Sequence, residues 1–164
     1  MRIVRWVATA LGALALLLGA VALGARFADG PVALFPGGAL RSGEWVDAPV
    51  DDWTFASDVQ EIELQLESES SSRTTWILVK EGQAYVPCSL GFPPGKRWHF
   101  AASEDGRAVL RIDGRRYPVA LTRAETEPGL GEALLSEVTR KYGNAPPSDA
   151  GVWIFRVASR PRGG

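Results

Sequence analysis

Cysteine, histidine and methionine each occur only once in this chain of 164 residues. The single cysteine, Cys88, cannot form an intramolecular disulfide, which excludes a disulfide-stapled secreted module. Together with the single histidine, His99, it supplies too few ligands for a structural zinc site, so we expect no metal. Residues 19–30 contain no cysteine, which argues against a lipoprotein signal.

A surplus of positive charge is also lacking. The formal net charge is −1, and two of the basic residues, Arg2 and Arg5, precede the apolar run at residues 7–25, whereas every acidic residue follows it. The rest of the chain therefore carries 16 basic and 19 acidic residues. A nucleic-acid partner is not expected, because binding to phosphates requires a basic face.

Long apolar runs are absent except for residues 7–25, which contain no charged residue. As a helix this run would span about 30 Å, the thickness of a bilayer's hydrocarbon core. The sequence predicts an N-terminal membrane anchor at residues 1–28, with the lipid bilayer as partner of residues 7–25. Two alternatives are a cleaved signal peptide, with a small-x-small site at residues 20–22, and a buried core helix.

The orientation of the anchor follows from the flanking charges. Arg2, Arg5 and the amino terminus precede the apolar run, and Trp6 lies where an interfacial aromatic belongs. This bias favours a cytoplasmic N-terminus. We therefore expect a single-pass protein of the inner (cytoplasmic) membrane, whose C-terminal domain faces the periplasm or the outside.

Residues 29–57 combine prolines and glycines with four large aromatics, a number that disordered linkers rarely carry. We predict an extended arm that packs on the following domain, which spans residues 58–160 and ends in a short tail at 161–164.

Alternating apolar and polar residues dominate the domain and predict strands. The expected strands lie at residues 59–67, 74–80, 83–87, 97–101, 108–112, 115–122 and 152–158. Glu81-Gly82 and Asp113-Gly114 predict tight hairpins, and helical spacing predicts one late helix at 129–142. Such a series favours a closed or partly closed barrel, because closure removes unpaired strand edges.

Side chains on the inward faces of these strands form the expected core. They are Ile62, Leu64, Trp76, Leu78, Val109, Trp153 and Phe155.

Several motifs between residues 73 and 124 resemble the split β-barrel flavin-binding superfamily. The run RTT at 73–75 is followed by an acidic-Gly turn and the return strand AYV at 84–86. A Ser89/Gly91 loop, the run KRWH at 96–99 and the hairpin DGRRY at 113–117 come next. This order is similar to pyridoxamine-phosphate-oxidase-like proteins, and most similar to the deazaflavin-dependent nitroreductase and quinone reductase family.

The resemblance implies a mainly β fold: a small split β-barrel-like domain with one late α-helix, preceded by an N-terminal transmembrane helix. It also implies FMN or a deazaflavin as cofactor and a homodimer as a candidate assembly. The implied cofactor-binding residues are Arg73, Thr74, Ser89, Lys96, Trp98 and His99. The sequence departs from the family at residues 68–72, where glycine and basic residues of the phosphate loop are replaced by serines and Glu69.

Each of these residues also has an ordinary structural interpretation. Arg73 and Lys96 could be solvated loop ends, Thr74 and Ser89 could serve strands and turns, and Trp98 could belong to the core. Cys88 and His99 lack an evident third member of a thiol-nucleophile site, so the catalytic residues remain unassigned.

Two functions from different classes follow. The first is a membrane-anchored, flavin-reductase-like oxidoreductase that passes hydride to a quinone-like acceptor, with the cofactor carrying the chemistry. The second is a non-enzymatic binding or assembly domain anchored at the outer face of the membrane.

We expect the protein to stay in the membrane fraction through salt and carbonate washes, because an apolar run of about 19 residues buries far more surface than a peripheral contact. Immunoblotting of the washed fractions measures this retention. A soluble mature protein that starts between residues 23 and 29 would instead demonstrate a cleaved signal peptide.

Overall fold

The computed structural model describes residues 2–91, 93, 95–124, 129–143 and 151–162. Part of the expected loop at 89–95 and of the expected tail at 161–164 lies outside these residues.

The described chain is mainly β, as the sequence predicts. The helices are α1 (Arg2–Ala25), α2 (Trp98–Glu104) and α3 (Leu130–Tyr142), with a 3₁₀ turn η1 (Thr54–Ala56). The strands are β1 (Glu44–Trp45), β2 (Glu61–Leu66), β3 (Ser72–Trp76), β4 (Leu78–Lys80), β5 (Gln83–Ser89), β6 (Arg107–Ile112), β7 (Arg115–Arg123) and β8 (Val152–Ser159). Both predicted hairpins and the predicted late helix are present.

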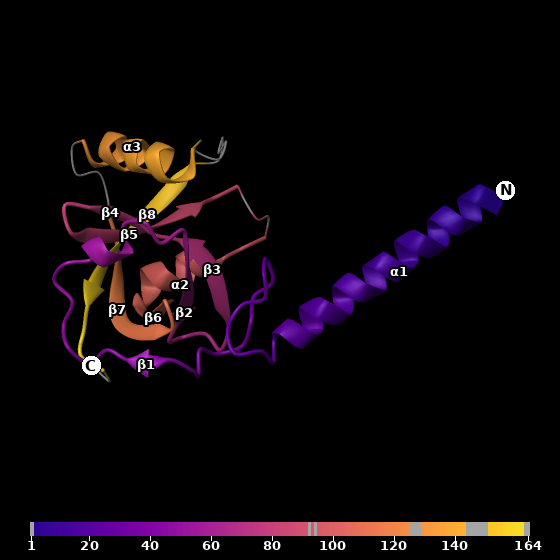
Figure 1. Ribbon diagram of the computed structural model, residues 1–164, viewed down its shortest axis with the longest axis horizontal. Helices are drawn as coiled ribbons and strands as arrows, with labels where there is room; N and C mark the ends of the chain where they lie inside the picture. The colour runs from indigo at the N-terminus through magenta and orange to yellow at the C-terminus, as the bar shows by residue number, and fades with distance from the viewer. Residues whose placement is uncertain (1, 92, 94, 125–128, 144–150, 163–164) are drawn as a thin grey trace.

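One sheet closes on itself through a single bent segment. Its strand order is β3-β2-β6-β7-β8-β5-β4, and β1 adds to β7 in parallel. The two ends of this order, β3 and β4, are consecutive in the chain and are separated only by Ile77. The segment pairs with β2 before the bend and with β5 after it. The sheet is therefore a barrel rather than an open layer (Figure 1), and the predicted single strand at 74–80 is two strands.

The bend at Ile77 is stabilised by the end of α3. The carbonyl of Ile77 accepts hydrogen bonds from Lys141 Nζ at 2.7 Å and from the Tyr142 hydroxyl at 3.2 Å. The same hydroxyl donates to the carbonyl of Gln60 at 2.6 Å. The Tyr142 ring stacks on Trp76 with centroids 3.9 Å apart. These contacts replace the ladder hydrogen bonds that the break in the strand removes.

The core fills the inside of the barrel. Of the residues predicted to be buried, Ile62, Leu64 and Phe155 belong to this core and are at most 1% exposed. Leu78 and Val109 are also buried but lie outside this core cluster, and Leu78 packs instead with Tyr85 and with Leu134 of α3. Trp76 and Trp153 are only half-buried, because Trp76 contacts α3 outside the barrel and Trp153 lies at its edge against His99.

The predicted strand at residues 97–101 is wrong, because α2 occupies this position. Trp98 and Ala102, one helical turn apart, are both buried in the core. Aromatic residues favour strands locally, but burial of this helical face decides the structure.

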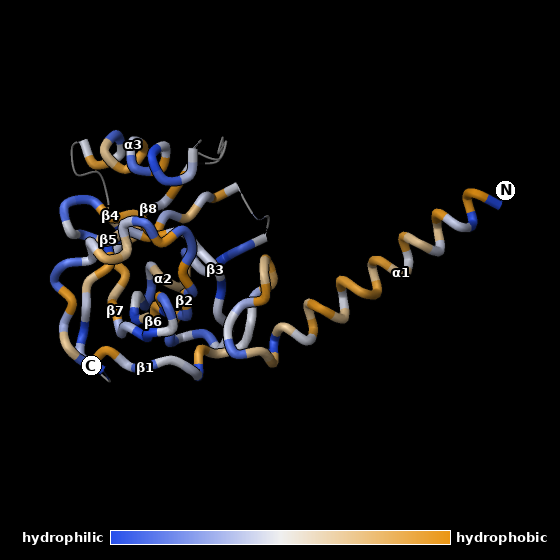
Figure 2. The backbone as a smooth tube through the Cα atoms, viewed as in Figure 1, coloured by the Kyte–Doolittle hydropathy of each residue, from blue (hydrophilic) through white to orange (hydrophobic). Residues whose placement is uncertain are grey.

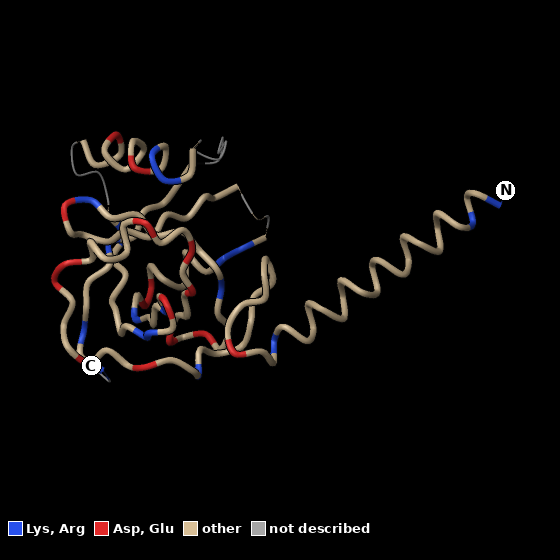
Figure 3. Tube along the Cα trace, in the orientation of Figure 1, with Lys and Arg blue, Asp and Glu red and all other residues tan. Residues whose placement is uncertain are grey.

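Helix α1 projects from the domain (Figure 1). Figure 2 shows its apolar length, and Figure 3 shows that charge is confined to its two ends. It is 24 residues long, and its most apolar stretch is not buried in the protein. Length and composition allow it to cross a membrane. The buried-core-helix alternative is wrong.

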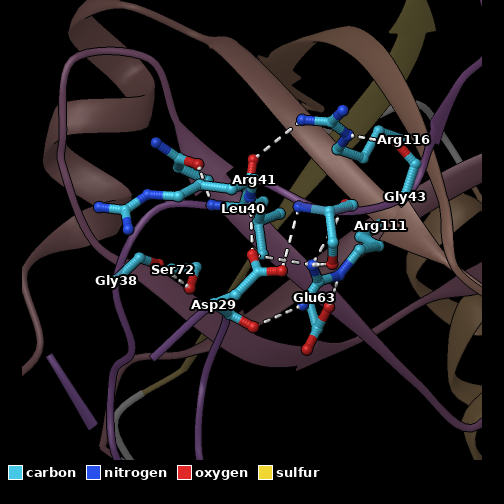
Figure 4. A network of polar contacts seen from close by, with 11 residues as sticks. Asp29, Gly38, Leu40, Arg41, Gly43, Glu63, Ser72, Arg111 and Arg116 are labelled. Carbon is cyan, nitrogen blue, oxygen red and sulfur yellow. Dashed lines mark hydrogen bonds and ion pairs between the residues drawn. The ribbon is translucent and has the colours of Figure 1, made fainter. Parts of the chain in front are cut away.

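The arm at 29–57 packs along the barrel and begins with a polar network (Figure 4). Arg111 on β6 binds Asp29 at 3.1 Å, the hydroxyl of Ser42 at 3.0 Å and the carboxylate of Glu63. Hydrogen bonds from Ser42, its backbone included, and from Arg41 hold the pKa of Asp29 well below its usual range. Further along the arm, Trp53 is only 2% exposed and joins the core.

The substitution Tyr142→Phe tests how much the hydrogen bonds at the Ile77 bend contribute to the stability of the fold. Removing the hydroxyl deletes the hydrogen bonds to Gln60 and Ile77 and keeps the ring on Trp76, so we expect a loss of about 0.5–1.5 kcal/mol in the free energy of unfolding. Urea unfolding of the full chain in mild detergent measures it. Tyr117→Phe is the matched control, because the described residues give its hydroxyl no hydrogen bond; it should lose less than about 0.5 kcal/mol.

Candidate functional site

Strand β3 presents alternate residues to opposite sides. The Ser72 hydroxyl donates to the carbonyl of Gly38 at 2.5 Å, and that of Thr74 is 3.4 Å from the carbonyl of Ala33. Both therefore face the arm. Arg73 lies between them and points toward Trp98, its guanidinium carbon 5.6 Å from the ring centroid. The period-2 geometry of a strand thus separates Arg73 from Thr74, although they are neighbours in sequence.

Arg73 is held in a partly desolvated position. Its side chain is 16% exposed and forms an ion pair with Glu69. Burial lowers the pKa of the guanidinium, and the charge of Glu69 opposes this shift. An arginine stays protonated at neutral pH even when burial lowers its pKa. Arg73 therefore places a positive charge at the end of the barrel where Trp98 lies.

Lys96 approaches the same place from the loop before α2. Its charge acts on Cys88, the buried last-but-one residue of β5. Burial raises the pKa of the Cys88 thiol, while the charges of Lys96 and Arg73 lower it. The thiol is therefore influenced by both cations. Ser89 adjoins it, with the Cys88 sulfur 3.9 Å from the Ser89 carbonyl.

Trp98 and His99 begin α2 within a group of aromatic rings. Trp98 is 6% exposed, and its ring lies 5.5 Å from that of Phe155. His99 is 5% exposed and meets Trp153 edge-on at 5.0 Å. Burial, followed by the charge of Lys96, lowers the pKa of His99. The imidazole is therefore neutral at neutral pH.

We call Arg73, Cys88, Lys96, Trp98 and His99 the basic cluster. Four of the six predicted site residues belong to it, and Ser89 adjoins it. Thr74 faces the arm instead. Two further residues take part that the sequence did not assign to the site: Cys88, and Glu69, which reaches Arg73 across the turn before β3.

Two nitrogens of the cluster lack partners. Arg73 Nε and His99 Nδ1 are buried and have no hydrogen-bond partner within the described part of the chain. A buried donor without a partner costs about 1–3 kcal/mol, so such atoms mark a place where a ligand atom or water would be favourable.

The cluster fits an anionic group better than a flavin ring. Two cations and the unpartnered Nε–H of Arg73 suit a phosphate or carboxylate. Trp98, however, packs into the core and offers no free face for stacking. Glu69 already occupies Arg73, and the described residues contain no group of three or more metal-ligating side chains.

Two hollows on the described surface lie elsewhere. One of about 290 Å³ is bordered by Glu63, Thr74 and Arg111, and one of about 420 Å³ lies between the β4–β5 hairpin and α3. Of the predicted site residues, Thr74 alone borders either of these two hollows.

No protein-family model and no curated protein sequence matches the chain. Among solved structures, it is similar to a Listeria innocua protein described as a pyridoxamine 5'-phosphate oxidase, with a TM-score of 0.44 and 13% identity over 64% of this chain and 90% of that one. It is also similar to Campylobacter jejuni ChuZ, with a TM-score of 0.46 and 9% identity over 65% of this chain and half of ChuZ. At these identities the likeness concerns the fold alone.

His99 predicts a specific pH dependence. Because its pKa is lower in the folded protein, the unfolded chain binds the proton more readily, and stability is highest above the ordinary pKa of 6.5. We expect the free energy of unfolding to fall as the pH decreases through about 6.5 toward the folded value. Urea unfolding at a series of pH values measures it.

His99→Phe supplies the control, since it keeps an aromatic ring against Trp153 and removes the only histidine. Its stability should be nearly constant between about pH 7.5 and 5.5. An equal pH dependence in both proteins would contradict the assignment to His99.

Proposed function

We propose that this protein is a membrane-anchored split-barrel-like domain that binds a small anionic ligand at the basic cluster. A phosphate-bearing flavin, FMN or a deazaflavin, is the ligand that the sequence resemblance favours. The associated activity is reduction of a quinone-like acceptor within the bilayer.

The observation that carries the proposal is the partly desolvated Arg73, which is 16% exposed and lies beside Trp98, at the end of the barrel where the loop with Lys96 leads into α2. The two cations come from different segments, β3 and the loop before α2. Fixed positive charge in a partly desolvated place attracts anions more strongly than an exposed lysine or arginine does. The unpartnered Nε–H of Arg73 adds a hydrogen-bond donor at the same end of the barrel.

The proposed anchor is α1, with its amino terminus in the cytoplasm and the domain outside. The connection to the domain supports close attachment, because Ala25 at the helix end is 3% exposed and Asp29 is already bound to Arg111. Little free chain separates helix and barrel, so the domain would lie next to the bilayer surface, where hydrophobic acceptors are found.

A non-enzymatic binding or assembly domain is the second candidate. Its support is the packing of Trp98, which is buried against Phe155 and is not available to a flavin ring as the structure stands. An anionic ligand without a ring system would need only the positive charges of Arg73 and Lys96, and not a free face of Trp98.

Titration of the full chain in mild detergent with FMN and with a deazaflavin, followed by cofactor fluorescence, separates the two candidates. If a flavin phosphate binds at the cluster, Arg73→Ala should weaken binding by about ten- to a hundredfold, the cost of one charge-assisted hydrogen bond. Glu69→Gln should strengthen binding, because it removes the carboxylate that competes for Arg73.

Arg107→Ala is the control, since Arg107 is exposed and pairs with Asp105; its affinity should equal that of the wild type. If neither cofactor binds below about millimolar concentration, a range that corresponds to about −4 kcal/mol, the oxidoreductase candidate should be dropped and the binding-domain candidate kept.

A further inference from the structure

The segment after α1 forms a compact loop with an apolar tip. Residues 28–38 begin and end at the same place, because the amide of Gly38 donates to the carbonyl of Ala28 at 3.1 Å. Gly30 and Gly37 approach so closely that a Cβ built on Gly37 would lie 1.7 Å from the Gly30 oxygen. Only glycine permits this contact. The loop is therefore an ordered element of the fold rather than a slack linker.

The tip of this loop is a tight hairpin. The amides of Val32 and Phe35 each donate to the other residue's carbonyl, at 3.1 and 3.0 Å. Ala33, at the first central position, adopts a left-handed φ of +52°, which an L-residue accepts only at some cost. The second central residue, Leu34, is 85% exposed. The fold thus holds a large apolar side chain outward in a defined position.

Two further apolar side chains are exposed in the same segment. Phe27, two residues after the end of α1, is 80% exposed, and Val32 is 39% exposed. The hairpin stands beside the domain end of α1 (Figure 1), and its tip is coloured as hydrophobic in Figure 2. Exposed residues of this size, gathered next to a helix long enough to span a membrane, are better explained by a partner than by chance.

We infer that Phe27, Val32 and Leu34 form a second membrane contact, which enters the boundary between headgroups and acyl chains beside α1. The inference rests on the proposed function, since it requires α1 to be in the bilayer. The partner of this apolar patch is the bilayer itself, because the patch follows directly on α1, the proposed membrane-spanning helix. The hairpin pairs the backbone groups of Val32 and Phe35 with each other, so these four groups would not be left without partners beside an apolar medium. Asp29, the nearby carboxylate, is bound by Arg111.

The contact would fix how the domain faces the membrane. The loop is attached to β3 by two backbone hydrogen bonds between Gly37 and Ser72, at 2.9 and 3.1 Å. The next residue of β3 is Arg73, on the opposite face of the strand. Strand β3 thus connects the proposed lipid contact with the basic cluster. If the loop at residues 28–38 entered the bilayer, the end of the barrel that carries the basic cluster would lie close to the bilayer surface.

Depth-dependent fluorescence quenching tests the contact in the full chain, reconstituted into vesicles of phosphatidylcholine and phosphatidylglycerol. Leu34→Cys is labelled with an environment-sensitive dye, and the unmodified chain, whose Cys88 is buried, gives the background. Glu44→Cys in β1, which lies away from the α1 junction (Figure 1), is the matched exposed control. Lipids spin-labelled near the headgroup should quench the probe at 34 several-fold more than the probe at 44.

A third labelled position, Ala15→Cys in the middle of α1, separates the possible failures. Absence of quenching at 15 by lipids spin-labelled in the middle of the acyl chain would overturn the membrane anchor and, with it, this inference. Lipid quenching at 15 with equal, weak quenching at 34 and 44 would overturn the second contact alone. Quenching at 34 by aqueous iodide would show a solvent-exposed tip, and protection from both quenchers would show a protein partner; either result also overturns it.

Discussion

The segment from Ser72 to Lys80 belongs to both ends of the sheet, so the backbone must leave one ladder and enter the other at Ile77. A buried carbonyl left without a donor at such a break costs about 1–3 kcal/mol. Lys141 and Tyr142 supply the donors from α3, which explains why a surface helix ends in a buried lysine. Burial lowers the pKa of this amine, but its carbonyl partners hold it in place. Barrel closure, the position of α3 and the orientation of β3 all depend on this junction.

Strand β3 then connects two different environments. Its outward residues, Ser72 and Thr74, receive the arm that comes from α1, and its inward residue, Arg73, brings charge to the basic cluster. The polar network around Arg111 fixes the arm on the neighbouring strands. The arm that follows α1 and the basic cluster are therefore connected through ordered contacts on one strand rather than through a flexible linker.

The features that could be predicted from the sequence are those that depend on residues close together in the chain. Alternation at residues 61–66 and the Asp113-Gly114 turn involve neighbours in the chain, and both were interpreted correctly. Helix α2 was missed because Trp98, His99 and Phe100 favour strands locally, whereas the burial of Trp98 with Ala102 is a tertiary effect. The bend at Ile77 and its bond to Lys141 join distant positions, which no local pattern reports. The separation of Arg73 from Thr74, by contrast, follows from simple strand alternation and could have been predicted from the sequence.

Because Cys88 is buried, its reaction with thiol reagents can be used to detect local opening of the barrel. A thiol that is 2% exposed and has a raised pKa is nearly inert toward alkylating reagents while β5 and β8 remain paired. Modification then requires a local opening, and the labelling rate divided by the reagent's rate with an exposed thiol gives the free energy of that opening. Because no second cysteine competes, thiol labelling would time the fluctuations of this end of the barrel directly, in a membrane as well as in detergent.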